Sequence, residues 1–147
     1  MYAFDVSEEM LKKARIALAD NPNVNFGLLS NAALPDSLTE KCDFIYAFDV
    51  FVHLDLHTMW KYFVGIQRAL KIGGRAFLHR TNLSAPGGWE HFSNQVEFSV
   101  GNHYPVSPEV IGILAENSGL TIIKTSVPDP SNSYLNRDYL FVVEKQM

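Results

Sequence analysis

A single carboxylate near the start of the chain lies in a position suited to holding a ribose. Asp5 ends a short apolar stretch, and Ser7 then begins a segment typical of a helix, with two acidic residues in its first turn. A carboxylate at the carboxyl end of a parallel strand can accept hydrogen bonds from both ribose hydroxyls, each contributing roughly 1.5–3 kcal/mol. Asp5 is therefore a candidate ribose ligand. Its alternative role is to cap the helix, a task that Ser7 already suits.

Three further side chains are candidates for acid–base chemistry. Asp49 follows an apolar run and would lie outside the carboxyl end of a strand, where α/β folds bind ligands. His53 comes soon after it, and His79 ends another apolar run. A histidine suits the removal of a proton from an oxygen nucleophile near neutral pH. The alternatives stay open, because Asp49 could cap a helix and each histidine could be a packed, hydrogen-bonded core residue.

The elements that must position these residues alternate between strand and helix patterns. We expect strands over 1–6, 24–29, 43–48 and 75–79, and one helix between Ser7 and Asn21. A second helix ends at a glycine pair, 73–74, and has an apolar stripe of Trp60, Phe63, Val64 and Leu70. The almost continuously apolar run 43–48 is typical of a central parallel strand buried on both faces. This order predicts an α/β fold with a doubly wound, mostly parallel sheet.

The last third of the chain has a different character. Residues 81–104 are rich in glycine, asparagine and aromatic residues without a clear period, which predicts an irregular lid over a binding site; it contains His91, His103 and Tyr104. Ser107 and Pro108 then predict the start of a helix that Gly119 ends. Two final strands, over 120–127 and 139–144, are joined by a turn-rich connection that shows no helix pattern. They are therefore expected to form an antiparallel hairpin.

Composition narrows the class of protein. The 147 residues suit one domain spanning 1–147, and the formal net charge of −4 argues against nucleic acid as a partner. No apolar run is long enough for a membrane span, and the first residues lack the pattern of a signal peptide. Cys42 is the only cysteine, so neither a disulfide framework nor a thiolate metal cluster is expected. These features predict a cytoplasmic protein without a metal site.

Three segments together resemble a known family. They are Phe4-Asp5-Val6-Ser7 with Met10, Asp43-Phe44-Ile45 with Val50 and His53, and Leu70-Lys71-Ile72-Gly73-Gly74. In this order and spacing they resemble the class I S-adenosylmethionine-dependent methyltransferases of the small-molecule type. The resemblance runs from that family's second strand to its terminal hairpin. It implies a Rossmann-like fold, S-adenosylmethionine as cofactor and a small-molecule methyl acceptor as substrate.

The resemblance also implies roles for individual residues. Asp5 would bind the ribose hydroxyls, and Val6 and Met10 would contact the adenine. Ser30 or Asn31 would lie near the adenine amino group. The segment Phe48, Asp49 and Val50 would lie beside the methionine part of the cofactor. The catalytic residue stays undecided among Asp49, His53 and His79.

One part of the family pattern is absent from these 147 residues. The family's first strand and its glycine-rich loop would precede Met1, so the chain resembles an N-terminally truncated methyltransferase. Because that strand lies in the middle of the sheet, we expect the strands on either side of it to pair directly or another chain to complete the sheet, with homo-oligomers as one outcome. Activity would then be impaired. The alternative from another class is a non-catalytic fragment or binding module completed by oligomerisation or a partner. A nicotinamide-dependent dehydrogenase shares the strand-end carboxylate but fits the hairpin and the glycine turn poorly.

Overall fold

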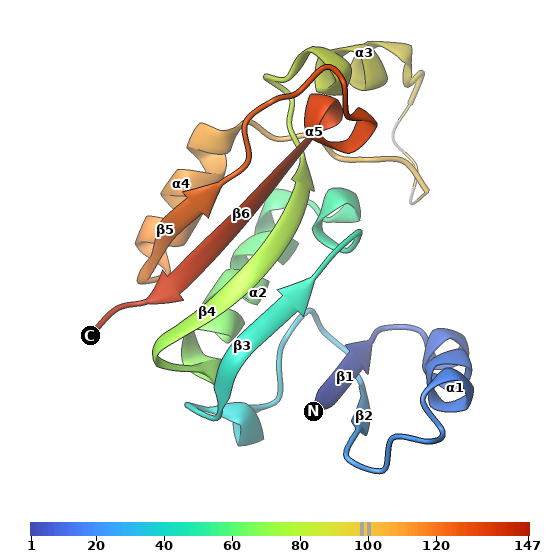
Figure 1. The fold of residues 1–147 in the computed structure, drawn as a ribbon, viewed down its shortest axis with the longest axis vertical. Coiled ribbons are helices and arrows are strands. Elements are labelled where there is room, and N and C mark those ends of the chain that lie inside the picture. The colour runs from blue at the N-terminus through green and yellow to red at the C-terminus, as the bar shows by residue number, and fades with distance from the viewer. Residues whose placement is uncertain (98, 100) are drawn as a thin grey trace. The chain divides into compact units, whose positions relative to one another are not determined.

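The computed structural model describes residues 1–97, 99 and 101–147, and the chain forms two compact units, residues 1–34 and 35–147 (Figure 1). Within the described residues, no helix has the length and apolar character needed to cross a bilayer. The expectation of one domain over 1–147 with a lid at 81–104 stays a prediction. Residues 98 and 100 of that expected lid lie outside the described residues.

The first unit is a strand–helix–strand motif. Strands β1 (Tyr2–Asp5) and β2 (Asn25–Leu28) pair in parallel, with helix α1 (Glu8–Ala17) between them in sequence. The Ser7 hydroxyl accepts a hydrogen bond from the Met10 backbone nitrogen at 3.3 Å, as expected of an N-cap. Leu11 is the buried residue of the helix. The predicted strands and cap are confirmed, although the helix ends at Ala17, short of Asn21.

The second unit contains a four-stranded sheet in the order β3-β4-β6-β5. Its strands are β3 (Cys42–Ala47), β4 (Leu70–Thr81), β6 (Asp138–Lys145) and β5 (Leu120–Thr125). β3 and β4 run parallel, whereas β6 runs antiparallel to both β4 and β5. The predicted antiparallel terminal hairpin is therefore confirmed. The parallel pair places the carboxyl ends of β3 and β4 at the same edge of the sheet.

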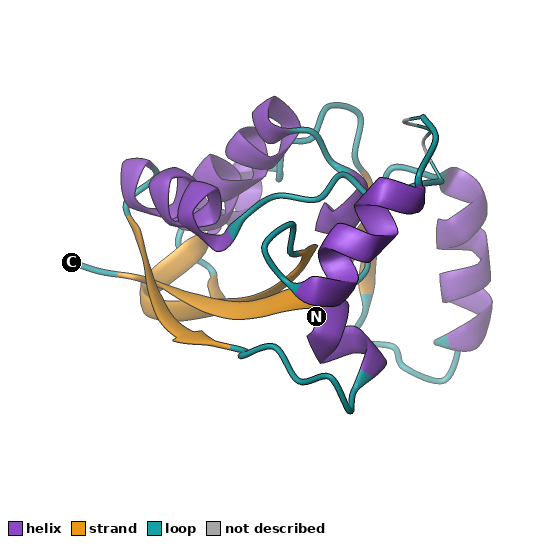
Figure 2. Cartoon of the chain, turned by 90° about the horizontal axis from the view of Figure 1, so that it is seen from above, coloured by secondary structure: helices purple, strands orange, loops and turns teal. Residues whose placement is uncertain are grey.

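Two helices cover one face of this sheet. Helices α2 (Leu56–Ala69) and α4 (Pro108–Asn117) lie on the same side of the strands (Figure 2). Their contact with the sheet forms a core in which each side chain is at most 2% exposed; it includes Met59, Phe63, Ile66, Ile111, Ala115, Ala76, Leu78, Phe141 and Val143. Burying each large apolar side chain stabilises the fold by roughly 1.5–3 kcal/mol. This core holds the strand ends that carry Asp49 and His79.

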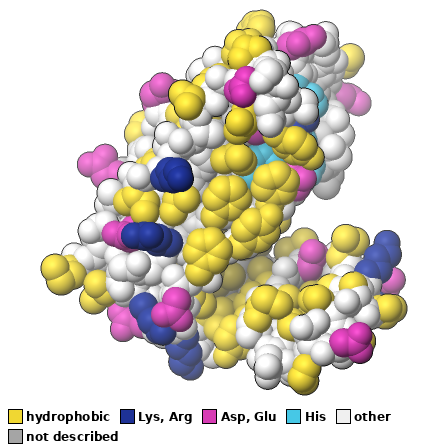
Figure 3. All heavy atoms as spheres, in the orientation of Figure 1, with side chains coloured by type: hydrophobic (Ala, Val, Ile, Leu, Met, Phe, Trp, Pro, Cys, Tyr) yellow, Lys and Arg dark blue, Asp and Glu magenta, His cyan; other side chains and the backbone are white. Residues whose placement is uncertain are grey.

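The opposite face of the sheet is largely open, which corrects one prediction. Phe44 and Tyr46 of β3 are 59% and 64% exposed, although the apolar run 43–48 predicted a strand buried on both faces. β3 is an edge strand of its sheet, and alternate side chains point away from the helices. The Tyr46 ring stacks on Phe77 at 5.6 Å between centroids. Hydrophobic side chains gather over this part of the second unit (Figure 3).

β1 and β3, the strands expected on either side of the absent family strand, belong to different sheets. β1 is hydrogen-bonded to β2 in a two-stranded sheet, and β3 is hydrogen-bonded to β4 in the four-stranded sheet. Each therefore has an edge that is unpaired within the described sheets. Such an edge presents backbone N–H and C=O groups that can pair with another strand.

Several element boundaries differ from the expected ones. α2 ends at Ala69 rather than at the glycine pair, and β4 begins at Leu70 and passes through Gly73, which has a φ of +74°. Val64 is 43% exposed and so lies outside the buried stripe. The connections also contain four short helical segments that were not expected: η1 (Asp36–Leu38), η2 (Phe51–His53), α3 (Pro86–Asn94) and α5 (Ser133–Arg137).

Helix α3 lies in the segment that was expected to be irregular. Its first turn contains Pro86, Gly87 and Gly88, a combination more typical of a loop. A Cβ atom at Gly88 would lie 1.7 Å from the backbone oxygen of Asn82, so packing requires glycine there. Glycine is needed at position 88 because the backbone of Asn82 passes close to it, and not because the chain turns there. Helix α4 begins at the predicted Pro108 after Ser107, and Gly119 follows its end with a φ of +74°.

Candidate functional site

The carboxyl edge of the first unit carries the residues proposed to hold a nucleoside. The Asp5 Oδ1 atom accepts a hydrogen bond from the Ser7 backbone nitrogen at 2.8 Å, which fixes the turn between β1 and α1. The carboxylate therefore shapes the strand-to-helix turn, and its second oxygen, Oδ2, is the atom that a ribose hydroxyl would approach. Val6 and Met10 are 66% and 51% exposed beside it. Large apolar side chains so exposed next to a fixed carboxylate provide surface for a flat ring.

Ser30 and Asn31 lie at this same edge. β1 and β2 are parallel, with Asp5 in register with Leu28, so the residues that follow β2 emerge on the side of Asp5. Both Ser30 and Asn31 are exposed. The first unit thus brings together all the residues expected around the ribose and the adenine. Which of them contacts a ligand stays a prediction.

In the second unit, Asp49 lies just beyond the end of β3 in an unusual backbone conformation. Its φ is +55°, a region that residues other than glycine rarely adopt and that often marks functional sites. Its backbone nitrogen donates to Nδ1 of His79 at 3.1 Å, and its Oδ1 atom lies 3.2 Å from the same Nδ1. The His79 side chain is fully buried, whereas that of Asp49 is 50% exposed. The two candidate residues are thus brought together, with the carboxylate facing solvent.

The other ring nitrogen of His79 faces a second carboxylate. Nε2 lies 3.1 Å from Oδ2 of Asp138, the first residue of β6. Arg137 donates to both Asp138 oxygens, at 2.9 and 2.7 Å. Burial opposes the ionisation of Asp138, but the close contact with His79 and the hydrogen bonds from Arg137 outweigh it and lower its pKa. Sequence reasoning missed Asp138 and Arg137, and the only local signal was a charged pair at the start of an expected strand.

Aromatic rings flank this cluster. Phe48 stacks on the His79 ring at 4.3 Å, and Tyr134 of α5 lies 5.8 Å from Phe48 and 6.3 Å from His79. Val50, on the other side of Asp49, is 45% exposed. The segment 48–50 therefore combines one ring packed on the buried histidine with a carboxylate and a valine that are open to a ligand.

His53 belongs to a second cluster, made of imidazoles. Its ring lies 5.5 Å from that of His103, which lies 4.7 Å from that of His91. His53 Nδ1 is 3.1 Å from the backbone oxygen of Asn102, and His103 Nδ1 is 2.7 Å from the Thr81 hydroxyl. In the part of the chain that the structure describes, no three such side chains are placed to hold a metal ion.

The surroundings of His103 disfavour its protonation. Burial lowers the pKa of His103 to about 4, with further lowering from the nearby charges of Arg137, His91 and His53, while Asp138 opposes the shift. Arg137 also interacts electrostatically with Asp49. Arg137 and Asp138 therefore link the imidazoles to the His79 cluster.

A hollow of about 440 Å³ opens beside the imidazoles. It is lined by Phe92, Gln95, Val96, Glu97, His103, Tyr104 and Pro105. Its mixture of aromatic walls with a few polar groups is typical of a small-molecule site, and its volume is in the usual range. Gln95 contributes an oxygen that is buried without a hydrogen-bond partner among the described residues. This hollow lies partly on α3, within the segment predicted to be a lid.

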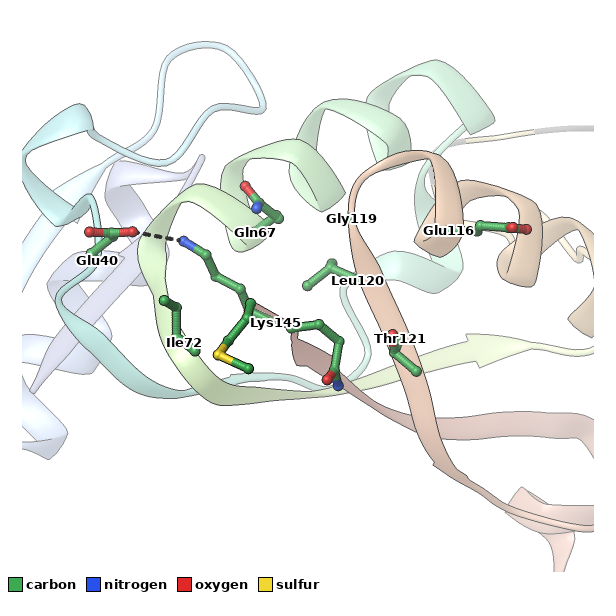
Figure 4. Close-up of a pocket in the computed structure, with 10 residues that line it drawn as sticks. Glu40, Gln67, Ile72, Glu116, Gly119, Leu120, Thr121 and Lys145 are labelled. Carbon is green, nitrogen blue, oxygen red and sulfur yellow. Dashed lines mark hydrogen bonds and ion pairs between the residues drawn. The ribbon is translucent and has the colours of Figure 1, made fainter.

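A larger hollow of about 530 Å³ lies at the other edge of the sheet, near the beginning of β5 and the end of β6. Figure 4 shows the side chain of Lys145 reaching toward Glu40, with which it forms an ion pair at 3.3 Å. Lys145 also donates to the backbone oxygen of Leu70 at 3.0 Å. This hollow is therefore separate from the strand ends that carry Asp49 and His79, and its lysine already has structural partners.

Comparison with known proteins decides the family. A family model described as a methyltransferase domain matches residues 1–74, half of the chain. The chain belongs to the methyltransferase domain family. The matched residues include the Asp5 turn, the Asp49 segment and the glycine pair that carried the resemblance. A comparison with curated proteins gave no match.

Solved structures confirm the Rossmann-like α/β fold of this methyltransferase domain. The PH0226 protein of Pyrococcus horikoshii is similar with a TM-score of 0.76 and 19% identity, over 99% of this chain and 71% of that one. An S-adenosylmethionine-dependent methyltransferase from Clostridium acetobutylicum is similar with a TM-score of 0.76 and 16% identity, over 99% of this chain and 75% of that one. A methyltransferase of the same description from Archaeoglobus fulgidus has a TM-score of 0.68 and 14% identity, over 98% of this chain and 75% of that one. The predicted class I methyltransferase fold is therefore confirmed.

Proposed function

We propose that this methyltransferase domain binds S-adenosylmethionine and acts in methyl transfer to a small-molecule acceptor. The observation that carries the proposal is the edge of the first unit, where the Asp5 carboxylate is fixed by Ser7 beside the exposed Val6 and Met10. Similar structures titled as S-adenosylmethionine-dependent methyltransferases support the choice of cofactor. The net charge of −4 favours a small acceptor over a nucleic acid.

In this proposal each unit contributes residues suited to one part of the cofactor. Asp5 would accept hydrogen bonds from the ribose hydroxyls, and Val6 and Met10 would cover the adenine, whose amino group would lie near Ser30 or Asn31. Phe48, Asp49 and Val50 would flank the methionine part. When bound, the cofactor supplies a methyl group that is electrophilic because it is attached to a sulfonium.

The protein's part in this reaction is chiefly one of positioning. An in-line displacement needs a nucleophile that is held close to the methyl carbon and aligned with it. Such positioning can lower the reaction barrier by up to about 7–11 kcal/mol. The hollow beside Phe92, Gln95 and His103 is the proposed acceptor site, since its polar groups could orient a small molecule. His53, next to it, is a candidate base for an acceptor that must lose a proton. Its Nδ1 must donate to the Asn102 carbonyl, so the neutral ring has its basic lone pair on Nε2.

These 147 residues contain no Gly-x-Gly-x-x-Gly loop, the element whose backbone amides usually approach such a cofactor. We therefore expect these residues by themselves to bind the cofactor weakly and to transfer methyl groups slowly. The second candidate function, a binding module completed by another chain, is favoured by one observation. Within the described sheets, β3 has an unpaired edge, and its aromatic side chains Phe44 and Tyr46 are exposed.

Isothermal titration with S-adenosylhomocysteine tests the proposal. Asp5→Ala removes the charged partner of two hydroxyls and should weaken binding at least about tenfold. Asp20→Ala, in the same unit and exposed, is the matched control and should bind as the unaltered chain does. Binding that survives unchanged in Asp5→Ala would refute the placement of the ribose. No binding by the unaltered chain, together with self-association, would favour the binding module.

A further inference from the structure

The fully buried imidazole of His79 is held between two carboxylates. Nδ1 faces Asp49, and Nε2 faces Asp138. Arg137 closes the series through its two hydrogen bonds to Asp138. The buried Asp138 carboxylate is paired with Arg137, whereas the half-exposed Asp49 carboxylate is in contact with solvent. With His79 neutral, the three charged side chains sum to −1, and one added proton on the ring brings the group to zero.

The hydrogen bonds define where the single proton of the neutral ring lies. A backbone N–H can only donate, so the bond from the Asp49 nitrogen requires a lone pair on His79 Nδ1. The proton of the neutral ring is therefore on Nε2, which lies 3.1 Å from Asp138 Oδ2 at an angle that does not form a regular hydrogen bond. Asp138 selects this tautomer because an ionised carboxylate can only accept.

A second proton on the His79 ring would be bound at Nδ1, close to an acceptor on Asp49. Asp49 Oδ1 lies 3.2 Å from Nδ1, so a proton that arrives at Nδ1 can be donated to that carboxylate. The neutral ring thus bonds to the backbone of Asp49, and the protonated ring bonds to its side chain. The left-handed backbone of Asp49, with φ at +55°, is what brings both groups to one nitrogen. The other groups that face His79 are Tyr134, at 6.3 Å, and the unionisable ring of Phe48.

We propose that Asp49, His79 and Asp138 form a proton relay for the acceptor. This rests on the proposed function. The acceptor's lone pair forms the new bond to the methyl carbon, the pair of the broken C–S bond stays on sulfur, and the proton of the acceptor O–H or N–H passes to the half-exposed Asp49 carboxylate. From Asp49 it moves to His79 Nδ1, and it returns by the same path to solvent. In this relay Asp49, in place of His53, is the base that takes the acceptor's proton, whereas His79 and Asp138 are positioning residues.

Nitrogen-15 NMR of the His79 ring in the 147-residue chain tests the relay without any cofactor. The neutral ring of the unaltered chain should be the Nε2–H tautomer. Asp138→Asn places an amide where only an acceptor fits, so the ratio of Nε2–H to Nδ1–H tautomer should fall about tenfold or more, equivalent to 1.4 kcal/mol. Glu116→Gln, an exposed carboxylate-to-amide change on α4, should leave the ratio unchanged.

The Asp49 side chain is tested on the doubly protonated ring, by repeating the experiment while the pH is lowered. The unaltered chain should then show a slowly exchanging Nδ1–H signal that Asp49→Asn weakens. An Nδ1–H tautomer in the neutral ring of the unaltered chain would overturn the relay, even if Asp138→Asn failed to fold. An identical signal in Asp49→Asn would also overturn it. If these signals are as predicted but S-adenosylhomocysteine does not bind, the proposed function fails while the hydrogen-bonded geometry stands.

Discussion

The guanidinium of Arg80 in β4 donates a hydrogen bond to the backbone oxygen of Leu54 at 2.8 Å, although Arg80 is fully buried. It also donates to the backbone oxygens of Phe51 and Tyr104. Burial lowers the pKa of Arg80 to about 10, against the raising effect of Tyr104 and Asp55. One side chain therefore ties the loop after Asp49 to the segment that carries the imidazoles.

Replacing Arg80 by methionine should destabilise the protein strongly. The backbone oxygens of Leu54 and Tyr104 would lose this donor, whereas that of Phe51 keeps the Leu54 backbone nitrogen. A lost hydrogen bond to a buried group costs about 1–3 kcal/mol, so we expect a loss of about 2 kcal/mol or more in the free energy of unfolding. Urea unfolding measures it. Arg75→Met is the control, because Arg75 forms an exposed pair with Glu144 and should lose less than about 1 kcal/mol. Equal losses in the two variants would show that Arg80 does not hold these segments.

Local patterns predicted much of this fold. Ser7 caps α1, and Pro108 is the first residue of α4, as predicted, because these signals depend on near neighbours in sequence. The exposure of Tyr46 was not predictable, since it depends on which strands pair beside β3. Helix α3 was hidden by Gly88, whose backbone contact with Asn82 is a tertiary requirement.

The residues of the candidate site also differ in whether the sequence alone could identify them. Asp5 and Asp49 were found because strand ends can be recognised in a sequence. Asp138 was missed because its contact with His79 follows from the antiparallel register of β4 and β6, which puts Thr81 opposite Asp138. No spacing rule in the sequence specifies that register.

Acid should weaken the fold through His103. Its pKa of about 4 lies below the ordinary value of 6.5, so the folded state binds fewer protons than the unfolded chain between these pH values. The stability that depends on neutral His103 is thus complete above about pH 6.5 and is lost as the pH falls toward 4. Solvent screening of this partly exposed ring reduces the effect to about 1 kcal/mol.

Urea unfolding at a series of pH values measures this dependence. His103→Gln should flatten the part of the curve between about pH 6.5 and 4, whereas His57→Gln on α2 should keep it. A His103→Gln curve that still falls as steeply as that of the unaltered chain would assign the acid sensitivity to other groups.

The exposed face of β3 should make the chain self-associate. An unpaired strand edge beside exposed aromatic rings is a site for pairing with another chain. Light scattering after size-exclusion chromatography should show an apparent mass that rises with concentration. Tyr46→Lys adds a charge at a side chain that is 64% exposed and should reduce the rise.

The matched control for this surface is Ile113→Lys, because Ile113 is 57% exposed on α4. It should associate as the unaltered chain does. A monomer at all concentrations would contradict the prediction, and so would equal behaviour of the two lysine variants.

Chemical-shift mapping during a titration with S-adenosylhomocysteine tests the central claim most directly. The account predicts that the backbone amide signals of residues 5–10, 30–31 and 48–50 shift together as the ligand is added, because these segments are proposed to hold the ribose, the adenine and the methionine part. Shifts confined to the other hollow, around Glu40 and Lys145, would contradict it. Saturating ligand with no shift near Asp5 would contradict it equally.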